Sequence, residues 1–164
     1  MNIELIISKL SSKAPIFEKV INQINFQHSD EENQVAFLCG TTIFFTDKLF
    51  LNFSIDEQLF IIAHETMHYI GHCMTSQFLG SKDKDDVLLN FVEDAQINQF
   101  LLKAGFHPPS GVVLLEDALD YTIEELYNLL LPKIKEMRSW GKNVTELENC
   151  SSISDILNSI NLKK

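Results

Sequence analysis

His64-Glu65-Thr66-Met67-His68 is the stretch of sequence around which the rest of this chain is interpreted. Its two histidines are four residues apart, so on a helix they lie one above the other on the same face. Two imidazoles in that arrangement can hold one metal ion, and the glutamate beside the first of them can act as general base toward a water on that ion. The motif therefore predicts a helix that carries half of a hydrolytic metal site.

This helix has a recognisable beginning and two candidate ends. Ser54-Ile55-Asp56-Glu57 has the pattern of a capping box, in which a serine and a glutamate three residues later satisfy each other's backbone N–H groups. Gly71 or Gly80 is the expected end, because glycine is common just after a helix. Apolar residues recur between these limits at Leu59, Phe60, Ile62, Ala63, Met67 and Ile70.

The chain before residue 34 predicts helices and a loop. Residues 3–10 are a short apolar segment with helical character. After Pro15, apolar residues recur at helical spacing over 16–24, so a second helix is expected there. Residues 28–33 are polar and read as a loop.

Two strands are expected between this loop and the motif. Residues 35–38 and 42–45 are short apolar runs, and Cys39-Gly40-Thr41 between them favours a hairpin. A strand at 42–45 could serve as an edge that pairs with an extended substrate, although at least one of its two phenylalanines belongs to the core. We expect residues 47–52 to be an irregular or extended lead-in to the motif helix.

Two further helices are expected after the motif. A charged loop at 81–86 precedes an apolar helix from about Val87 to Lys103, with Gly105 as its terminator. Residues 106–111 are too rich in proline for regular structure. Thr122-Ile123-Glu124-Glu125 is a second capping box, and its helix should run to about Lys135 or Arg138.

Composition limits the class of protein. The chain has 164 residues and a net charge of −10, which suits one acidic domain over residues 1–164, with a polar tail and short helix over 141–164. Such a charge disfavours a nucleic-acid partner, because affinity for phosphates rests on Lys and Arg. Three scattered cysteines fit a reducing compartment, and the sequence has neither a signal peptide nor an apolar run of about 20 residues. We expect a cytoplasmic protein with no membrane partner; its oligomeric state stays open.

A catalytic zinc site needs a third protein ligand, and His72 is the first candidate. His72 lies eight residues beyond His64, so its Cα is about 12 Å farther along an unbroken helix axis. Only a break at Gly71 would bring the two histidines to one metal. We therefore expect His72 either to support the metal ligands from outside the metal or to be a plain surface residue.

The other two candidates for the third ligand lie in the helix predicted at 87–103. Asn90, Asp94 and Asn98 form a polar stripe on an otherwise apolar helix. Burying such a stripe is costly unless it is hydrogen-bonded or binds something, and the alternative is a stripe that is exposed to solvent. Asp94 can supply the carboxylate oxygen, with the two asparagines orienting it. Glu93 points about 100° away from Asp94, so only one of them can face the metal, and the stripe favours Asp94.

The sequence also resembles a known family beyond the bare motif. The matching segments are Leu51-Asn52, the motif helix with His72 soon after it, residues 90–98, residues 104–106 with Pro109, and residues 122–127. In this order they resemble the putative metallopeptidase domain that often precedes a von Willebrand factor A-like domain in bacterial and phage proteins. The resemblance covers roughly residues 30–131.

The resemblance implies an α+β, zincin-like fold, mainly helical with a small sheet or hairpin before the motif helix. It also supports Asp94 as the third ligand. Two departures matter: the histidine after the motif falls one position earlier than is usual in the family, and residues after 131 leave room only for a short tail. A short version without the A-like domain suggests a phage or mobile-element protein.

We therefore expect a zinc metallopeptidase that hydrolyses a protein or peptide substrate. His64, His68 and Asp94 would hold Zn²⁺, and Glu65 would be the general base. The oxyanion could be stabilised by Tyr69, Tyr121 or His107, and the sequence does not choose among them. Two alternatives are a metal-binding interaction module of zincin-like fold that lacks turnover and a structural helical protein with a coincidental motif.

Overall fold

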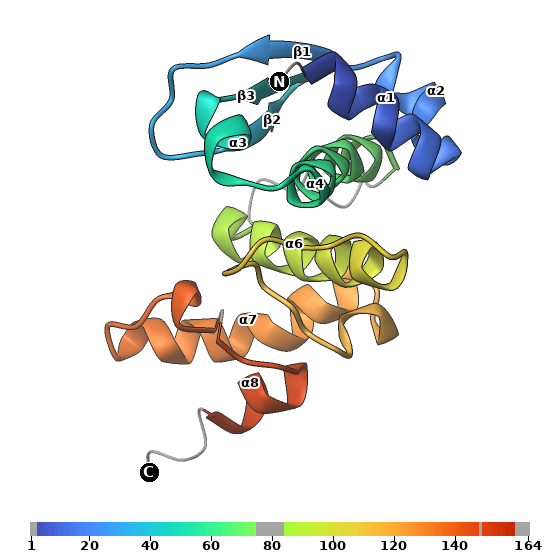
Figure 1. Ribbon diagram of the computed structural model, residues 1–164. Helices are drawn as coiled ribbons and strands as arrows, with labels where there is room; N and C mark the ends of the chain where they lie inside the picture. Colours follow the sequence, from blue (N-terminus) through green and yellow to red (C-terminus); the bar gives the residue numbers. More distant parts are fainter. Residues whose placement is uncertain (1–2, 75–83, 148, 160–164) are drawn as a thin grey trace. The chain divides into compact units, whose positions relative to one another are not determined.

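The computed structural model describes residues 3–74, 84–147 and 149–159. The chain forms two compact units, one of residues 1–76 and 101–109 and the other of residues 77–100 and 110–164. Helices predominate and three short strands form one sheet, which confirms an α+β fold (Figure 1). No helix in the described ranges is long and apolar enough to cross a membrane. That these units make one domain stays a prediction.

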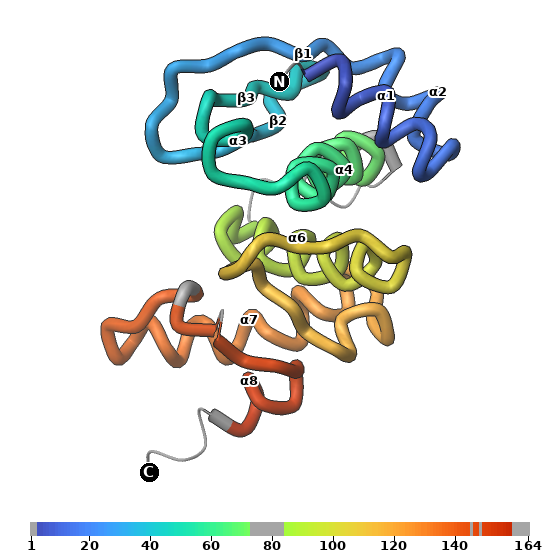
Figure 2. The backbone as a smooth tube through the Cα atoms, in the orientation of Figure 1, coloured from blue at the N-terminus to red at the C-terminus, as the bar shows by residue number. Residues whose placement is uncertain are grey.

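The sheet belongs to the first unit and contains strands β1 (Asn25–His28), β2 (Ala36–Cys39) and β3 (Thr42–Phe45). The strand order is β1-β3-β2, with β1 parallel and β2 antiparallel to β3. The expected hairpin is confirmed, because β2 and β3 are consecutive antiparallel strands (Figure 2). Gly40 between them has φ 61°, a conformation that favours glycine. The expectation that 42–45 is an edge strand was wrong, because β3 lies between the other two strands.

The first helices of this unit are α1 (Ile3–Lys13), the 3₁₀ turn η1 (Pro15–Phe17) and α2 (Glu18–Ile21). They confirm helical structure over 3–10, and they replace the single helix expected over 16–24 by two shorter pieces. Helix α3 (Asp47–Asn52) contradicts the extended lead-in expected there. Its Leu49 is fully buried, so the segment contributes to the core.

Helix α4 (Ile55–Met74) carries the HExxH motif, and its predicted beginning is confirmed. The Ser54 N–H donates to Glu57 Oε2 at 2.8 Å, and the Glu57 N–H donates to Ser54 Oγ at 3.4 Å. Ile62 and Ala63 are fully buried on its inner face. Helix α4 packs against α1 and β2 within the first unit (Figure 1). The motif is therefore built on a long, well-anchored element.

The second unit contains most of helix α6 (Asp86–Lys103), with η2 (Ala118–Asp120), α7 (Ile123–Ser139), η3 (Val144–Leu147) and α8 (Ile153–Ser159). The capping box predicted before α7 is present: the side chains of Thr122 and Glu125 each accept a bond from the other's backbone. The helix passes through Pro132 and ends at Ser139, close to the predicted end, and Gly141 just beyond it has φ 75°. A shared apolar core joins these elements, and α8 confirms a short helix in the polar tail.

Asp85 organises the beginning of α6. Its Oδ1 accepts from the Leu88 N–H at 3.1 Å, its own N–H donates to the Tyr127 hydroxyl at 2.8 Å, and its carboxylate forms a two-point ion pair with Arg138. One residue thus caps α6 and joins it to α7. At the other end of α6, Gly105 has φ 82° and the Phe106 N–H donates to Leu101 O at 3.0 Å, so the predicted glycine terminator is confirmed.

Candidate metal centre

His64 and His68 face one another on α4, as their spacing predicts. Their Nε2 atoms lie 3.0 Å apart, and the ring centroids are 4.7 Å apart. Two imidazole nitrogens bound at about 2.0–2.1 Å to one tetrahedral zinc lie about 3.3 Å from each other. The two Nε2 atoms are therefore at nearly the separation that a shared zinc ion requires. Metal binding would need both rings protonated at Nδ1, which leaves both Nε2 lone pairs for the ion.

The histidine pair is part of a longer row of rings. Phe60, His64, His68 and His72 follow one another at four-residue spacing along one face of α4. Phe60 is 1% exposed and its ring stacks near that of His64, with centroids 6.3 Å apart and planes at 27°. A buried phenyl ring on one side limits the orientations of the His64 imidazole. From the sequence, Phe60 was expected only as a core residue, although its position four residues before His64 already indicates that the two rings share one face of the helix.

Glu65 follows His64 on α4 and is half-buried. The next residue, Thr66, is fully buried, and its hydroxyl donates to Ile62 O at 2.7 Å. The side of α4 on which Thr66 lies therefore faces the core. Partial burial leaves the Glu65 carboxylate accessible to a water molecule, as a general base requires.

His72 lies on an unbroken helix. Helix α4 continues through Gly71 to Met74, so the prediction that Gly71 ends the helix was wrong. The other expected end, Gly80, lies outside the described residues. His72 is exposed, with its ring centroid 6.1 Å from that of His68. Because the break that would bring His72 and His64 to one metal is absent, these two residues do not share a single ion.

The polar stripe predicted on α6 is present, and its residues differ in burial. Asn90 is exposed, Asp94 is half-buried and Asn98 is 3% exposed. The Asn90 amide donates to Asp94 Oδ2 at 3.0 Å, whereas the Asn98 amide donates to Val113 O at 2.9 Å. Glu93 is buried at 6% exposure. Helix α6 thus carries the half-buried residue Asp94, whose carboxylate accepts a hydrogen bond from the Asn90 amide.

Two further sets of polar side chains are the candidates for stabilising the oxyanion and the residues around His28. Tyr69 and Tyr121 are half-buried and His107 is exposed, so the choice of an oxyanion-stabilising residue stays open. A hollow of about 290 Å³ lies where β1 and β3 end, lined by residues 28–32 and 46–48.

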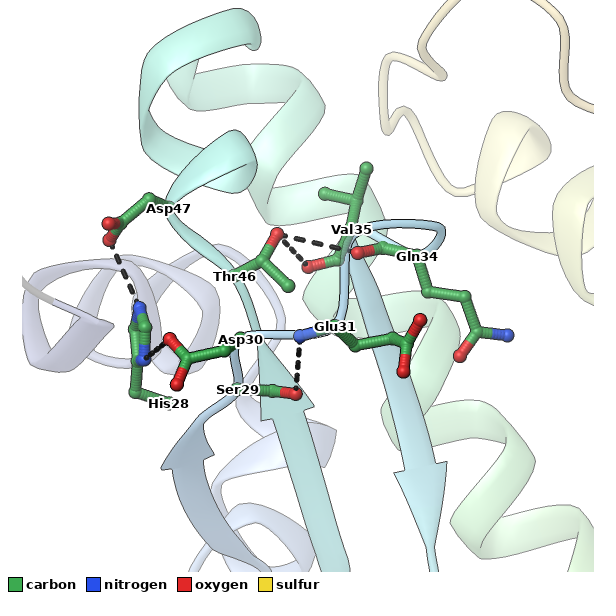
Figure 3. A network of polar contacts seen from close by, with 8 residues as sticks. All are labelled: His28, Ser29, Asp30, Glu31, Gln34, Val35, Thr46 and Asp47. Carbon is green, nitrogen blue, oxygen red and sulfur yellow. Dashed lines mark hydrogen bonds and ion pairs between the residues drawn. The ribbon is translucent and has the colours of Figure 1, made fainter.

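His28, one of the residues that line this hollow, contacts two aspartates (Figure 3). Its Nε2 lies 3.1 Å from Asp47 Oδ1 and its Nδ1 lies 3.9 Å from Asp30 Oδ1. Nearby, the Thr46 hydroxyl donates to Val35 O at 3.2 Å and ties α3 to β2. The side chain of His28 is 47% exposed and those of both aspartates are more exposed, so solvent screens these ion pairs and we assign no site to them.

The fold and these side chains define a helical α+β protein, and two groups of its described residues have the ligand types to hold a metal ion: His64, His68 and Asp94, and His68, His72 and Glu93. A model of the putative metallopeptidase domain matches residues 3–149, and the chain belongs to that family. The match is wider than the region of about 30–131 expected from the sequence. Comparison with curated proteins and with solved structures gave no match. Family and ligand types together support a metal cofactor and a hydrolase.

Proposed function

We propose that this protein is a zinc metallopeptidase whose metal is held by His64, His68 and Asp94. The observation that carries the proposal is the 3.0 Å separation of the two Nε2 atoms within a chain of the metallopeptidase domain family. Two neutral nitrogens and one carboxylate oxygen are a donor set that suits zinc and leaves a fourth position for water. Asp94 is preferred to Glu93 because its carboxylate belongs to the polar stripe and is only half-buried.

Zinc bound by these residues would act as a Lewis acid that acidifies a water and polarises a carbonyl. Two residues of the chain, Glu65 and Phe60, have the remaining roles. The Glu65 carboxylate accepts the proton of the attacking water and delivers it to the nitrogen of the leaving amine. Phe60 restricts the His64 ring, so that Nε2 keeps its direction during turnover.

The substrate in this proposal is an extended protein or peptide. Because β3 is central, the edges of the described sheet belong to β1 and β2. We assign the substrate backbone to β2, since this strand packs against α4, which carries the histidines. The proposal includes a cytoplasmic location, which the three scattered cysteines support; Cys39 and Cys150, the two whose state the structure describes, are free thiols.

Hydrolysis of an unstructured peptide library tests the peptidase proposal. Glu65→Gln should keep its metal and lose about 10²–10⁴-fold of the cleavage rate, because the amide cannot accept the proton. Glu18→Gln, an exposed change of the same type on α2, is the matched control and should cleave like wild type.

Two results would contradict the proposal. Equal cleavage by Glu65→Gln would show that the activity does not use Glu65. Metal binding without cleavage of any peptide would favour the interaction module that lacks turnover.

A further inference from the structure

Asn90 and Asp94 form the best-defined polar pair on α6. They are one turn apart, and the Asn90 Nδ2 donates to Asp94 Oδ2 at 3.0 Å. Asn90 is exposed, so burial does not force its amide toward the carboxylate. An amide bonded to a charged acceptor on the next turn makes a stronger hydrogen bond than a neutral pair does.

This hydrogen bond restricts the rotation of the carboxylate. An aspartate has two soft side-chain torsions, and ordering them when a metal binds costs conformational entropy. An amide that already orients the group removes part of that cost. Residues that orient a metal ligand in this way are commonly worth 10–100-fold in metal affinity.

We propose that Asn90 is a positioning residue for Asp94: its amide holds the carboxylate in the orientation that binds the metal. The inference rests on the proposed function, because it assumes that Asp94 is a ligand. Asn90 acts through Asp94 and does not itself touch the metal or the substrate. The Asn98 amide donates to the carbonyl of Val113 at 2.9 Å, and the proposal concerns Asn90 alone.

Zinc affinity measured by competition with a coloured chelator tests the inference without using activity. Asn90→Ala should weaken the affinity about tenfold or more. Asn90→Gln, which keeps an amide that can reach Asp94, should recover most of it. Asn128→Ala, an exposed asparagine-to-alanine change on α7, is the matched control and should bind like wild type. Because alanine forms helices better than asparagine, a weaker Asn90→Ala variant cannot be attributed to loss of helix.

The absorption spectrum of the Co²⁺-substituted protein gives a second readout, and its ligand-field bands should shift in Asn90→Ala and return in Asn90→Gln. Wild-type affinity and spectrum in Asn90→Ala, while Asp94→Ala loses the metal, would overturn the role of Asn90 and leave the proposed ligands standing. A wild-type chain that binds no zinc would overturn both.

Discussion

At the scale of single residues, the row of rings on α4 assigns different roles to residues that look alike in the sequence. Phe60 is buried beside His64, His68 is 8% exposed, and His72 is exposed at the far end of the row. The Nε2 atoms of His64 and His68 lie 3.0 Å apart. The sequence could predict this pair because helix geometry fixes the relation of residues four apart. It could not predict how deeply each ring is buried, because burial depends on packing against other elements.

His72→Ala tests the assignment at this scale. The variant should keep the metal content and peptidase activity of wild type, because an unbroken α4 places the Cα of His72 about 12 Å beyond that of His64. Metal content and cleavage rate are measured side by side with His68→Ala, which should lose both. Loss of metal in His72→Ala would contradict the assignment and make His72 a ligand.

At the scale of elements, local signals predicted the helices that have caps and missed the elements that depend on distant partners. Both capping boxes are present, because their bonds join residues only three apart. Strand β1 was missed because its four residues become a strand by parallel pairing with β3. Helix α3 is too short for a clear periodicity, and its Thr46 N-cap uses its hydroxyl to bond Val35 O instead of capping the helix.

Asp85 is the element-scale residue that the sequence did not single out, and Asp85→Ala tests its importance. The change removes the cap of α6 and the partner of Arg138, so the free energy of unfolding should fall by about 2 kcal/mol at pH 7. The estimate is modest because the Arg138 side chain is 42% exposed and solvent screens the pair. Urea unfolding gives the measurement, with the neighbouring exposed Asp86→Ala as control.

The same pair predicts a pH dependence. The hydrogen bond from Arg138 holds the pKa of Asp85 below its ordinary value. A carboxyl whose pKa is lower in the folded state stabilises the protein above its unfolded pKa of about 3.9, and that stabilisation is lost as pH falls through the folded pKa. The difference in unfolding free energy between wild type and Asp85→Ala should therefore shrink below about pH 4. A difference that grows in acid would contradict this role.

At the scale of the whole molecule, the proposed ligands come from two helices that are separate in the sequence. His64 and His68 belong to α4, and Asp94 belongs to α6. The sequence predicted the histidine pair from helical spacing and Asp94 from a polar stripe on an apolar helix. It could not predict that Asn90 donates to Asp94 while Asn98 donates to Val113 O, because the two asparagines are equally spaced from Asp94 and the Val113 carbonyl is brought to Asn98 by tertiary packing.

The central claim is the proposal that His64, His68 and Asp94 bind one metal ion, and the metal content of protein purified without added zinc tests it most directly. Elemental analysis should find about one zinc ion per chain in wild type and almost none in His64→Ala and in Asp94→Ala, with unchanged far-UV circular dichroism in all three. Full zinc content in Asp94→Ala, or none in the wild-type chain, would contradict the claim.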